Sequence, residues 1–97
     1  EKEMAQRMAV KYGNDNIFDC IELTDEYSIY EIPVPKSWVG SSILEKDVRK
    51  KYAISILATK KDEKLSPLPG ADYVFEGDET LIIMGHFNDV RAVLKMH

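Results

Sequence analysis

The sequence predicts an α+β domain in which helices pack against a small, mainly antiparallel sheet. Three observations lead to this fold class. Several short stretches are rich in β-branched and aromatic residues or alternate apolar with polar ones, and turn residues separate them. Three other stretches carry apolar residues at helical spacing. The two kinds of stretch are interspersed along 97 residues, which is enough for one small domain with a modest core.

The first helical pattern covers residues 1–12, and Gly13-Asn14-Asp15-Asn16 ends it. The chain begins Glu1-Lys2-Glu3-Met4, without an initiator Met or a helix cap. We therefore expect residues 1–16 to be a helix and linker leading out of a preceding domain, and residues 17–97 to form the folded unit. The apolar positions of the expected helix are Met4, Ala5, Met8, Ala9 and Tyr12.

A β-hairpin is predicted next. Residues 17–23 alternate in the manner of a strand, and Thr24-Asp25-Glu26 supplies a turn. Residues 27–33 are β-branched and aromatic enough to return as the second strand. Pro33 and Pro35 end that strand, because proline has no amide hydrogen to donate to a neighbour.

A second helix is predicted after Gly40. Ser42 and Glu45 have the spacing of a capping box, in which each side chain bonds the other residue's backbone amide. Leu44, Val48 and Tyr52 follow at intervals of four residues. The pattern predicts one short amphipathic helix that ends near Tyr52.

The remaining elements are strands and a last helix. Residues 53–59 predict a strand, followed by a charged hairpin turn at residues 60–64. Residues 73–75 and 80–85 predict two more strands, and the second is apolar on both faces and therefore central. In the last helix, Asn88 or Asp89 is expected to cap, and the buried stripe is Val90, Val93 and Leu94.

Composition excludes several classes of function. A formal net charge of −4 argues against general nucleic-acid binding, which depends on an excess of Lys and Arg. The single cysteine, Cys20, has no second cysteine for a disulfide, which points to a reducing compartment and hence the cytoplasm. No apolar run approaches the roughly 20 residues of a membrane-spanning helix.

The sequence offers no recognisable catalytic or metal-binding set. His86 and His97 are not spaced with other ligand types, and Cys20 is expected to be a small core residue. Gly70, Gly77 and Gly85 do not form a phosphate-binding loop. We expect no enzymatic activity, no metal and no tightly bound cofactor.

One concentration of charge stands out on the second predicted helix, at Lys46, Arg49, Lys50 and Lys51. It has two explanations. Basic residues in the last turn of a helix suit the helix dipole, so the cluster fits a solvated face. A cation beside aliphatic side chains would also suit a ligand with flat bases and phosphates, because arginine forms paired hydrogen bonds with phosphate. Periodicity does not choose between them.

Several segments together resemble the RCK C-terminal domain, also called TrkA-C, of regulators of Ktr- and Trk-type potassium transporters. The resemblance covers about residues 17–95. Its most specific parts are Val48-Arg49-x-x-Tyr52 and the strand from Gly77-Asp78 to Gly85. Two positions depart from the family pattern: Lys46 stands where an apolar residue is usual, and Ala53 stands where glycine is common.

The resemblance implies a homodimer in the cytosolic gating ring of a potassium transporter or channel, at the inner face of the membrane through a potassium-transporting subunit. It also implies that cyclic di-AMP binds between the two copies and modulates potassium uptake. In this reading Arg49 faces phosphate, Asp47 meets a polar edge of the ligand, and three aliphatic residues contact the adenines. The complete implied set is Ile43, Leu44, Asp47, Val48, Arg49, Ser55 and Pro67.

Two alternatives stay open. The first is a dimerisation and coupling module of a cation-transporter regulator that has no nucleotide ligand. The second is an amino-acid-binding domain of the ferredoxin-like type, which would need a Gly-rich turn between its first strand and first helix. The sequence has no such turn.

Overall fold

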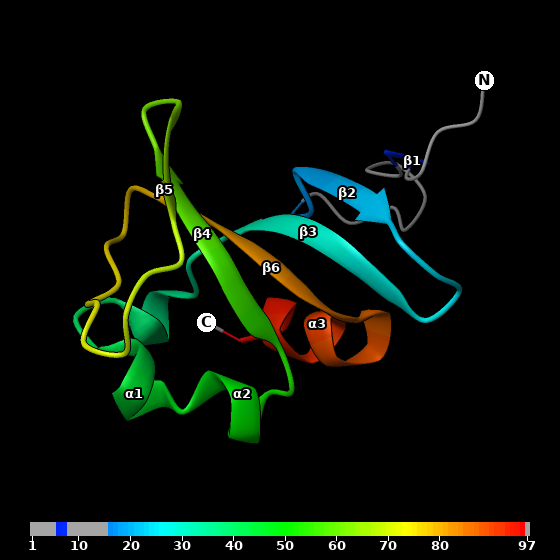
Figure 1. Ribbon diagram of the computed structural model, residues 1–97. Helices are drawn as coiled ribbons and strands as arrows, with labels where there is room; N and C mark the ends of the chain where they lie inside the picture. The colour runs from blue at the N-terminus through cyan, green and yellow to red at the C-terminus, as the bar shows by residue number, and fades with distance from the viewer. Residues whose placement is uncertain (1–5, 8–15, 97) are drawn as a thin grey trace.

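The structure is a computed structural model that describes residues 6–7 and 16–96 (Figure 1). It contains one six-stranded sheet in the order β1-β2-β3-β6-β4-β5, and every pair of neighbours is antiparallel. The predicted α+β fold with an antiparallel sheet is therefore confirmed. The strands are β1 Gln6–Arg7, β2 Asp19–Glu22, β3 Tyr27–Pro33, β4 Ser55–Lys61, β5 Lys64–Pro67 and β6 Thr80–His86. The helical elements are η1 Lys36–Trp38, α1 Ile43–Lys46, α2 Val48–Lys51 and α3 Phe87–Leu94.

Strand β6 occupies the centre of the sheet, as its apolar sequence predicts. It pairs with β3 along its whole length, from Tyr27 opposite His86 to Pro33 opposite Thr80, and with β4 on its other side. Two hairpins flank this centre. Thr24 Oγ1 accepts the amides of Glu26 and Tyr27 in the β2–β3 turn.

The β4–β5 hairpin turns at Asp62 and Glu63, within the charged turn that the sequence predicts. Both residues have positive φ angles, 54° and 64°. Two consecutive positive φ angles are typical of the tight turns that suit the twist of a two-stranded hairpin. The tip of the hairpin projects beyond the rest of the sheet (Figure 1).

The helices lie on one side of the sheet (Figure 1). Alternate side chains of the central strands point to that side and are buried, including Tyr30 and Ile32 of β3 and Leu81 and Ile83 of β6. Val90 and Val93 of α3 complete the core, as predicted. Cys20 is fully buried, which confirms that it is a core residue.

The only tryptophan, Trp38, anchors the region beneath α1 and α2. Its ring is fully buried and packs against the rings of Tyr52 and Phe75, with centroids 5.2 and 5.3 Å away. Its indole Nε1 has no hydrogen-bond partner among the described residues. The segment before α1, the end of α2 and the loop after β5 therefore share one aromatic cluster.

The second predicted helix is two short helices. Asp47 has a left-handed conformation, with φ 53° and ψ 50°, and its amide donates to the carbonyls of Ile43 and Leu44. This conformation ends α1 and starts α2 in a new direction. The change of direction lets Val48 enter the core while α1 stays at the surface.

Three further expectations differ from the structure. Residues 73–75 do not join the sheet: Val74 forms an isolated bridge with Ser42, because this segment runs beside the loop before α1. Helix α3 begins earlier than predicted, and its cap is His86, whose Nδ1 accepts the amide of Asn88 at 3.1 Å. Gln6–Arg7 is an edge strand of the sheet that pairs with β2, whereas the spacing predicts a helix there. The rest of that expected helix lies outside the described residues.

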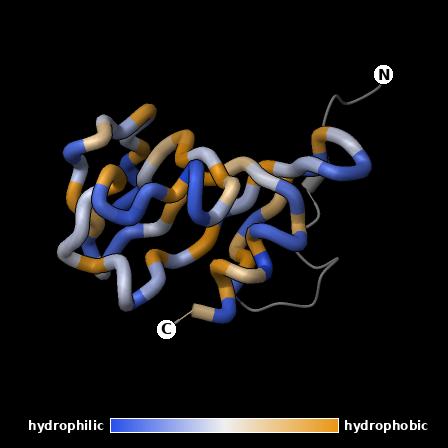
Figure 2. The backbone as a smooth tube through the Cα atoms, turned by 90° about the horizontal axis from the view of Figure 1, so that it is seen from below, coloured by the Kyte–Doolittle hydropathy of each residue, from blue (hydrophilic) through white to orange (hydrophobic). Residues whose placement is uncertain are grey.

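Hydrophobic residues are distributed in short stretches along the chain. Figure 2 shows them as brief orange segments separated by hydrophilic ones. Within the described ranges, no helix has both the length and the apolar character needed to cross a membrane.

Candidate ligand-binding site

Helix α1 starts with the capping box that the sequence predicts. The Glu45 amide donates to Ser42 Oγ at 3.0 Å, and the Ser42 amide donates to Glu45 Oε1 at 2.8 Å. Both bonds satisfy amides that the first turn of a helix otherwise leaves without a partner. The box therefore fixes the point at which α1 begins.

The loop after β5 supplies acceptors for the next amides of α1. Ile43 donates to the Tyr73 carbonyl at 3.0 Å, and Leu44 donates to the Ala71 carbonyl at 2.9 Å. A helix N-terminus binds anions through free amides, and the amides of Ile43, Leu44 and Glu45 are all in use. These three amides are therefore not free to bind an anion.

The implied ligand-contacting residues of α1 and α2 lie on one continuous segment but differ in exposure. Leu44 is 70% exposed, whereas Ile43 is half-buried and packs against the core. Val48 is only 2% exposed, so it supports the surface from beneath. Asp47 is exposed at the junction of the two helices.

Arg49 is exposed on α2, next to the exposed Lys50 and Lys51. Among the described residues, no carboxylate forms an ion pair with its guanidinium. All three cations are in the last turn of α2, where they also suit the helix dipole. The guanidinium is available to an external anion.

Ser55 and Pro67 come from the sheet. Ser55 is the first residue of β4, opposite Met84, and Pro67 is the exposed last residue of β5, opposite Ala58. The chain that leaves Pro67 stays beside β4, because the Leu68 amide donates to the Leu57 carbonyl at 2.8 Å. It then reaches α1 at Ala71. The loop after Pro67 thus connects the strand residues of the set to the helix residues.

The sequence interpretation missed two features of this region. Leu68 is 77% exposed and has a positive φ of 48° between two prolines, which turns an aliphatic side chain outward next to Pro67. The Pro-Leu-Pro sequence is a signal that could have identified it. The second feature is that the carbonyls of Ala71 and Tyr73 accept backbone amides of α1. A pattern of side chains in the sequence cannot indicate such backbone hydrogen bonds.

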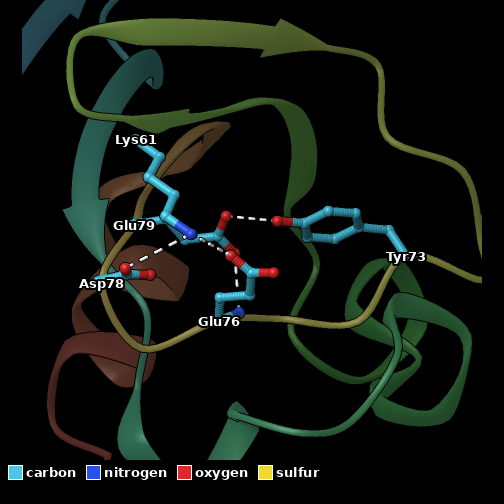
Figure 3. Close-up of polar contacts among 5 residues, drawn as sticks. All are labelled: Lys61, Tyr73, Glu76, Asp78 and Glu79. Carbon is cyan, nitrogen blue, oxygen red and sulfur yellow. Dashed lines mark hydrogen bonds and ion pairs between the residues drawn. The ribbon is translucent and has the colours of Figure 1, made fainter.

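A polar cluster lies under the β4–β5 hairpin, on the far side of the same loop (Figure 3). The Tyr73 hydroxyl donates to Glu79 Oε1, and the Glu76 amide donates to Glu79 Oε2 at 3.0 Å. Lys61 Nζ lies 2.9 Å from Glu76 Oε1 and 3.4 Å from Asp78 Oδ2. The Lys61 ion pairs therefore connect the loop to β4, whereas the buried carboxylate of Glu79 connects two groups within the loop.

Two pKa values respond to this cluster. Desolvation and the hydrogen bond to Glu79 raise the pKa of the Tyr73 hydroxyl to about 12. The hydrogen bond with Glu76 and the charge of Asp78 raise the pKa of Lys61. Tyr73 therefore stays protonated, and a donor, throughout the physiological range.

Three hollows of about 300 Å³ lie elsewhere on the molecule. One separates the end of β3 from α3, one lies under the β4–β5 hairpin, and one lies on the sheet face around Ile29 and Ile82. None of the three is lined by Ile43, Leu44, Asp47, Val48, Arg49 or Ser55, or by Pro67. Within the described residues, no group of three or more His, Cys, Asp or Glu could hold a metal ion.

The sequence matches a family and characterised relatives. The TrkA-C domain model matches residues 28–97. Ktr system potassium uptake proteins C and A of Bacillus subtilis (strain 168) are each 33% identical to the chain, over 90 and 91 residues. The aligned region is 93% and 94% of the chain but 41% of each relative, so the chain spans about two fifths of their length.

Solved structures share the fold. The RCK C domain of the potassium transport protein KtrA, determined in complex with cyclic diadenosine monophosphate, is 34% identical with a TM-score of 0.64. That match covers 70% of the chain and 80% of the KtrA domain. The RCK domain of GsuK is 19% identical with a TM-score of 0.62, over 94% of the chain and 17% of GsuK, and it supports the fold alone.

Proposed function

Because the chain belongs to the TrkA-C domain family, we propose that it is the ligand-sensing domain of a regulatory subunit for potassium uptake. In this proposal, two copies form a homodimer and bind one cyclic di-AMP molecule between them. Binding then modulates a membrane potassium-transporting subunit from the cytoplasmic side. Residues 1–16 connect the sensing domain, residues 17–97, to a preceding domain. The proposal includes no catalytic role and no cofactor besides the ligand.

The observation that carries the proposal is the complex of the KtrA domain with cyclic diadenosine monophosphate, at 34% identity to this chain. Two features of the chain support it. Leu44 presents an exposed aliphatic surface for a base, and Arg49 presents an exposed guanidinium that forms no ion pair with a carboxylate of the described residues. The amides at the start of α1 are already occupied, so Arg49 carries more of the phosphate binding than it would beside a free helix terminus.

A symmetric ligand explains why the set need not form a pocket in one copy. A two-fold interface presents each residue twice, once on each side of the axis. Ile43, Leu44 and Asp47 of each copy would then form one wall, and Arg49 of each copy would meet one phosphate. Ser55 and Pro67 border this wall, and Val48 supports it from the core.

Titration calorimetry with cyclic di-AMP tests the proposal. The wild-type chain should bind at micromolar or lower concentration, with one ligand for each pair of chains. Arg49→Ala should weaken binding at least tenfold, because a hydrogen bond to a charged group contributes about 1.5–3 kcal/mol and each dimer loses two. Lys50→Ala is the matched control, since Lys50 is an exposed cation on the same helix.

A coupling module without a nucleotide is the alternative, and the same titration separates the two. Absence of heat from the wild-type chain at micromolar ligand would contradict the nucleotide proposal. Analytical ultracentrifugation of the same sample would show whether the chain is nevertheless a dimer, which is what the coupling module requires.

A further inference from the structure

Glu79 is a buried carboxylate that holds the loop between β5 and β6 in one conformation. It is 4% exposed, and both of the donors described above, the Tyr73 hydroxyl and the Glu76 amide, belong to this loop. A buried carboxylate is costly unless it accepts hydrogen bonds. Each of these bonds therefore favours the loop conformation in which both donors reach Glu79.

Tyr73 connects this buried carboxylate to α1. Its hydroxyl donates to Glu79, while its carbonyl accepts the amide of Ile43. Its own amide donates to the Gly70 carbonyl at 3.0 Å, which closes a turn around Ala71, the residue whose carbonyl accepts the amide of Leu44. A shift of the Tyr73 ring would therefore move the two loop carbonyls that accept amides of α1.

Helix α1 is too short to hold its own position. It has four residues, and a single helical turn is not stable by itself in water. Helix α2 differs, because Val48 anchors it directly in the core. Loosening the loop is therefore expected to displace Leu44 while leaving Arg49 in place.

We propose that the Tyr73–Glu79 hydrogen bond is a tether that positions α1, so that Tyr73 and Glu79 set the affinity for the cyclic dinucleotide without touching it. This inference rests on the proposed function. Tyr73 and Glu79 are positioning residues: they hold the base-contacting part of the site and leave the phosphate-contacting part unaffected.

Amide hydrogen exchange, followed by NMR on the free chain, tests the tether without any ligand. Tyr73→Phe removes only the hydroxyl and should raise exchange at Ile43 and Leu44 by about three- to tenfold, the effect of losing one hydrogen bond. Exchange at Ile83 and Val90, in the core, should change less. Tyr27→Phe is the matched control, because Tyr27 lies at the far end of β3 beside His86.

Glu79→Gln is a second variant, which changes the acceptor of the Tyr73–Glu79 hydrogen bond instead of its donor. It keeps the shape of the side chain but leaves one acceptor oxygen for two donors. It should raise exchange at the same two amides, and it allows the test to proceed if Tyr73→Phe does not fold. Unchanged exchange at Ile43 and Leu44 in the folded variants would overturn the tether.

Calorimetric titration with cyclic di-AMP tests the link to affinity through a double-mutant cycle. Tyr73→Phe should weaken binding by about three- to tenfold. Its change in binding free energy should add to that of Arg49→Lys, because the phosphate contact is held separately. Together with Leu44→Ala, the change should be smaller than the sum of the two single changes, because both substitutions act on the same contact.

The outcomes are separable. Raised exchange with unchanged affinity, or full additivity with Leu44→Ala, would overturn the positioning role. A wild-type chain that binds no cyclic di-AMP would overturn the proposed function and the affinity claim with it. The exchange experiment would still decide whether the tether holds α1.

Discussion

The amide of Ile43 donates a 3.0 Å hydrogen bond to the carbonyl of Tyr73, so the first turn of α1 depends on the loop between β5 and β6. The capping box supplies the remaining support. Because α1 has only four residues, these contacts at its N-terminal end determine whether it forms. The stability of this region can therefore be tested one contact at a time.

Replacing Ser42 with alanine should destabilise the chain by about 1 kcal/mol, because the Glu45 amide loses its acceptor. Urea denaturation followed by Trp38 fluorescence measures the change, since the only tryptophan packs beneath this region. Ser41→Ala is the control, because the bonds described for Ser41 involve only its backbone. Equal loss of stability in the two variants would contradict a capping role.

Replacing Ala53 with glycine should stabilise the chain by roughly 1 kcal/mol. Ala53 has a φ of 59°, a left-handed conformation that costs an L-residue energy and glycine very little. Thermal unfolding measures the gain.

Ala92→Gly makes the same substitution on the exposed side of α3 and should have the opposite sign. Glycine in a helix costs about 1 kcal/mol relative to alanine. If both variants lose stability, the left-handed backbone at Ala53 does not carry the expected strain.

Replacing Gly85 with alanine should cost about 1–3 kcal/mol, the usual effect of overpacking a core. A Cβ there would lie 3.0 Å from Cγ2 of Ile54, the residue before β4, and 3.5 Å from Cγ2 of Val90 in α3. Gly77→Ala is the control, because its Cβ would meet only Val39 Cγ2 at an ordinary 3.8 Å. Denaturant midpoints of the two variants should therefore separate, and similar midpoints would refute the close packing at Gly85.

Tyr73 should make stability depend on pH in the alkaline range. Its pKa is raised from 10.0 to about 12 in the folded chain, so folding favours the protonated hydroxyl. Its contribution is fully present below pH 10, the unfolded pKa, and is lost as the pH rises from 10 to about 12.

Ultraviolet absorbance of tyrosinate checks this titration directly. The wild-type chain should show tyrosinate absorbance that develops well above the pKa of an exposed tyrosine, and Tyr73→Phe should lose the part of it that Tyr73 contributes. The variant should also lose less stability between pH 10 and 12 than the wild type. A late transition of unchanged size in the variant would assign the raised pKa to another tyrosine.

Local patterns in the sequence predicted much of the fold. The β-branched and aromatic content of β3, the apolar run of β6 and the capping box at Ser42 each depend on neighbouring residues, and all three predictions are confirmed. The break at Asp47 was not predictable in this way. Left-handed residues at helix ends are usually glycine, and here an aspartate adopts that conformation so that Val48 can enter the core.

The candidate site was predictable only as a segment. The sequence identified the stretch that contains Leu44 and Arg49, but their different exposure from Val48 depends on how α2 packs. The carbonyls of Ala71 and Tyr73 support α1 through backbone hydrogen bonds between segments that are distant in the chain. The periodicity of side chains carries no information about such hydrogen bonds. The predicted cap of α3 was wrong for another reason: asparagine and aspartate are commoner caps than histidine, and here His86 is the cap.

The burial of Cys20 has a practical consequence for chemical labelling. The only thiol of the chain has no solvent-accessible surface in the fold. Maleimide reagents should therefore leave the native chain unmodified and react when it unfolds. A cysteine introduced at an exposed position such as Leu68 would then be the single labelled site of the native chain. It would place a fluorophore next to the proposed interface, and Cys20 would not have to be replaced first.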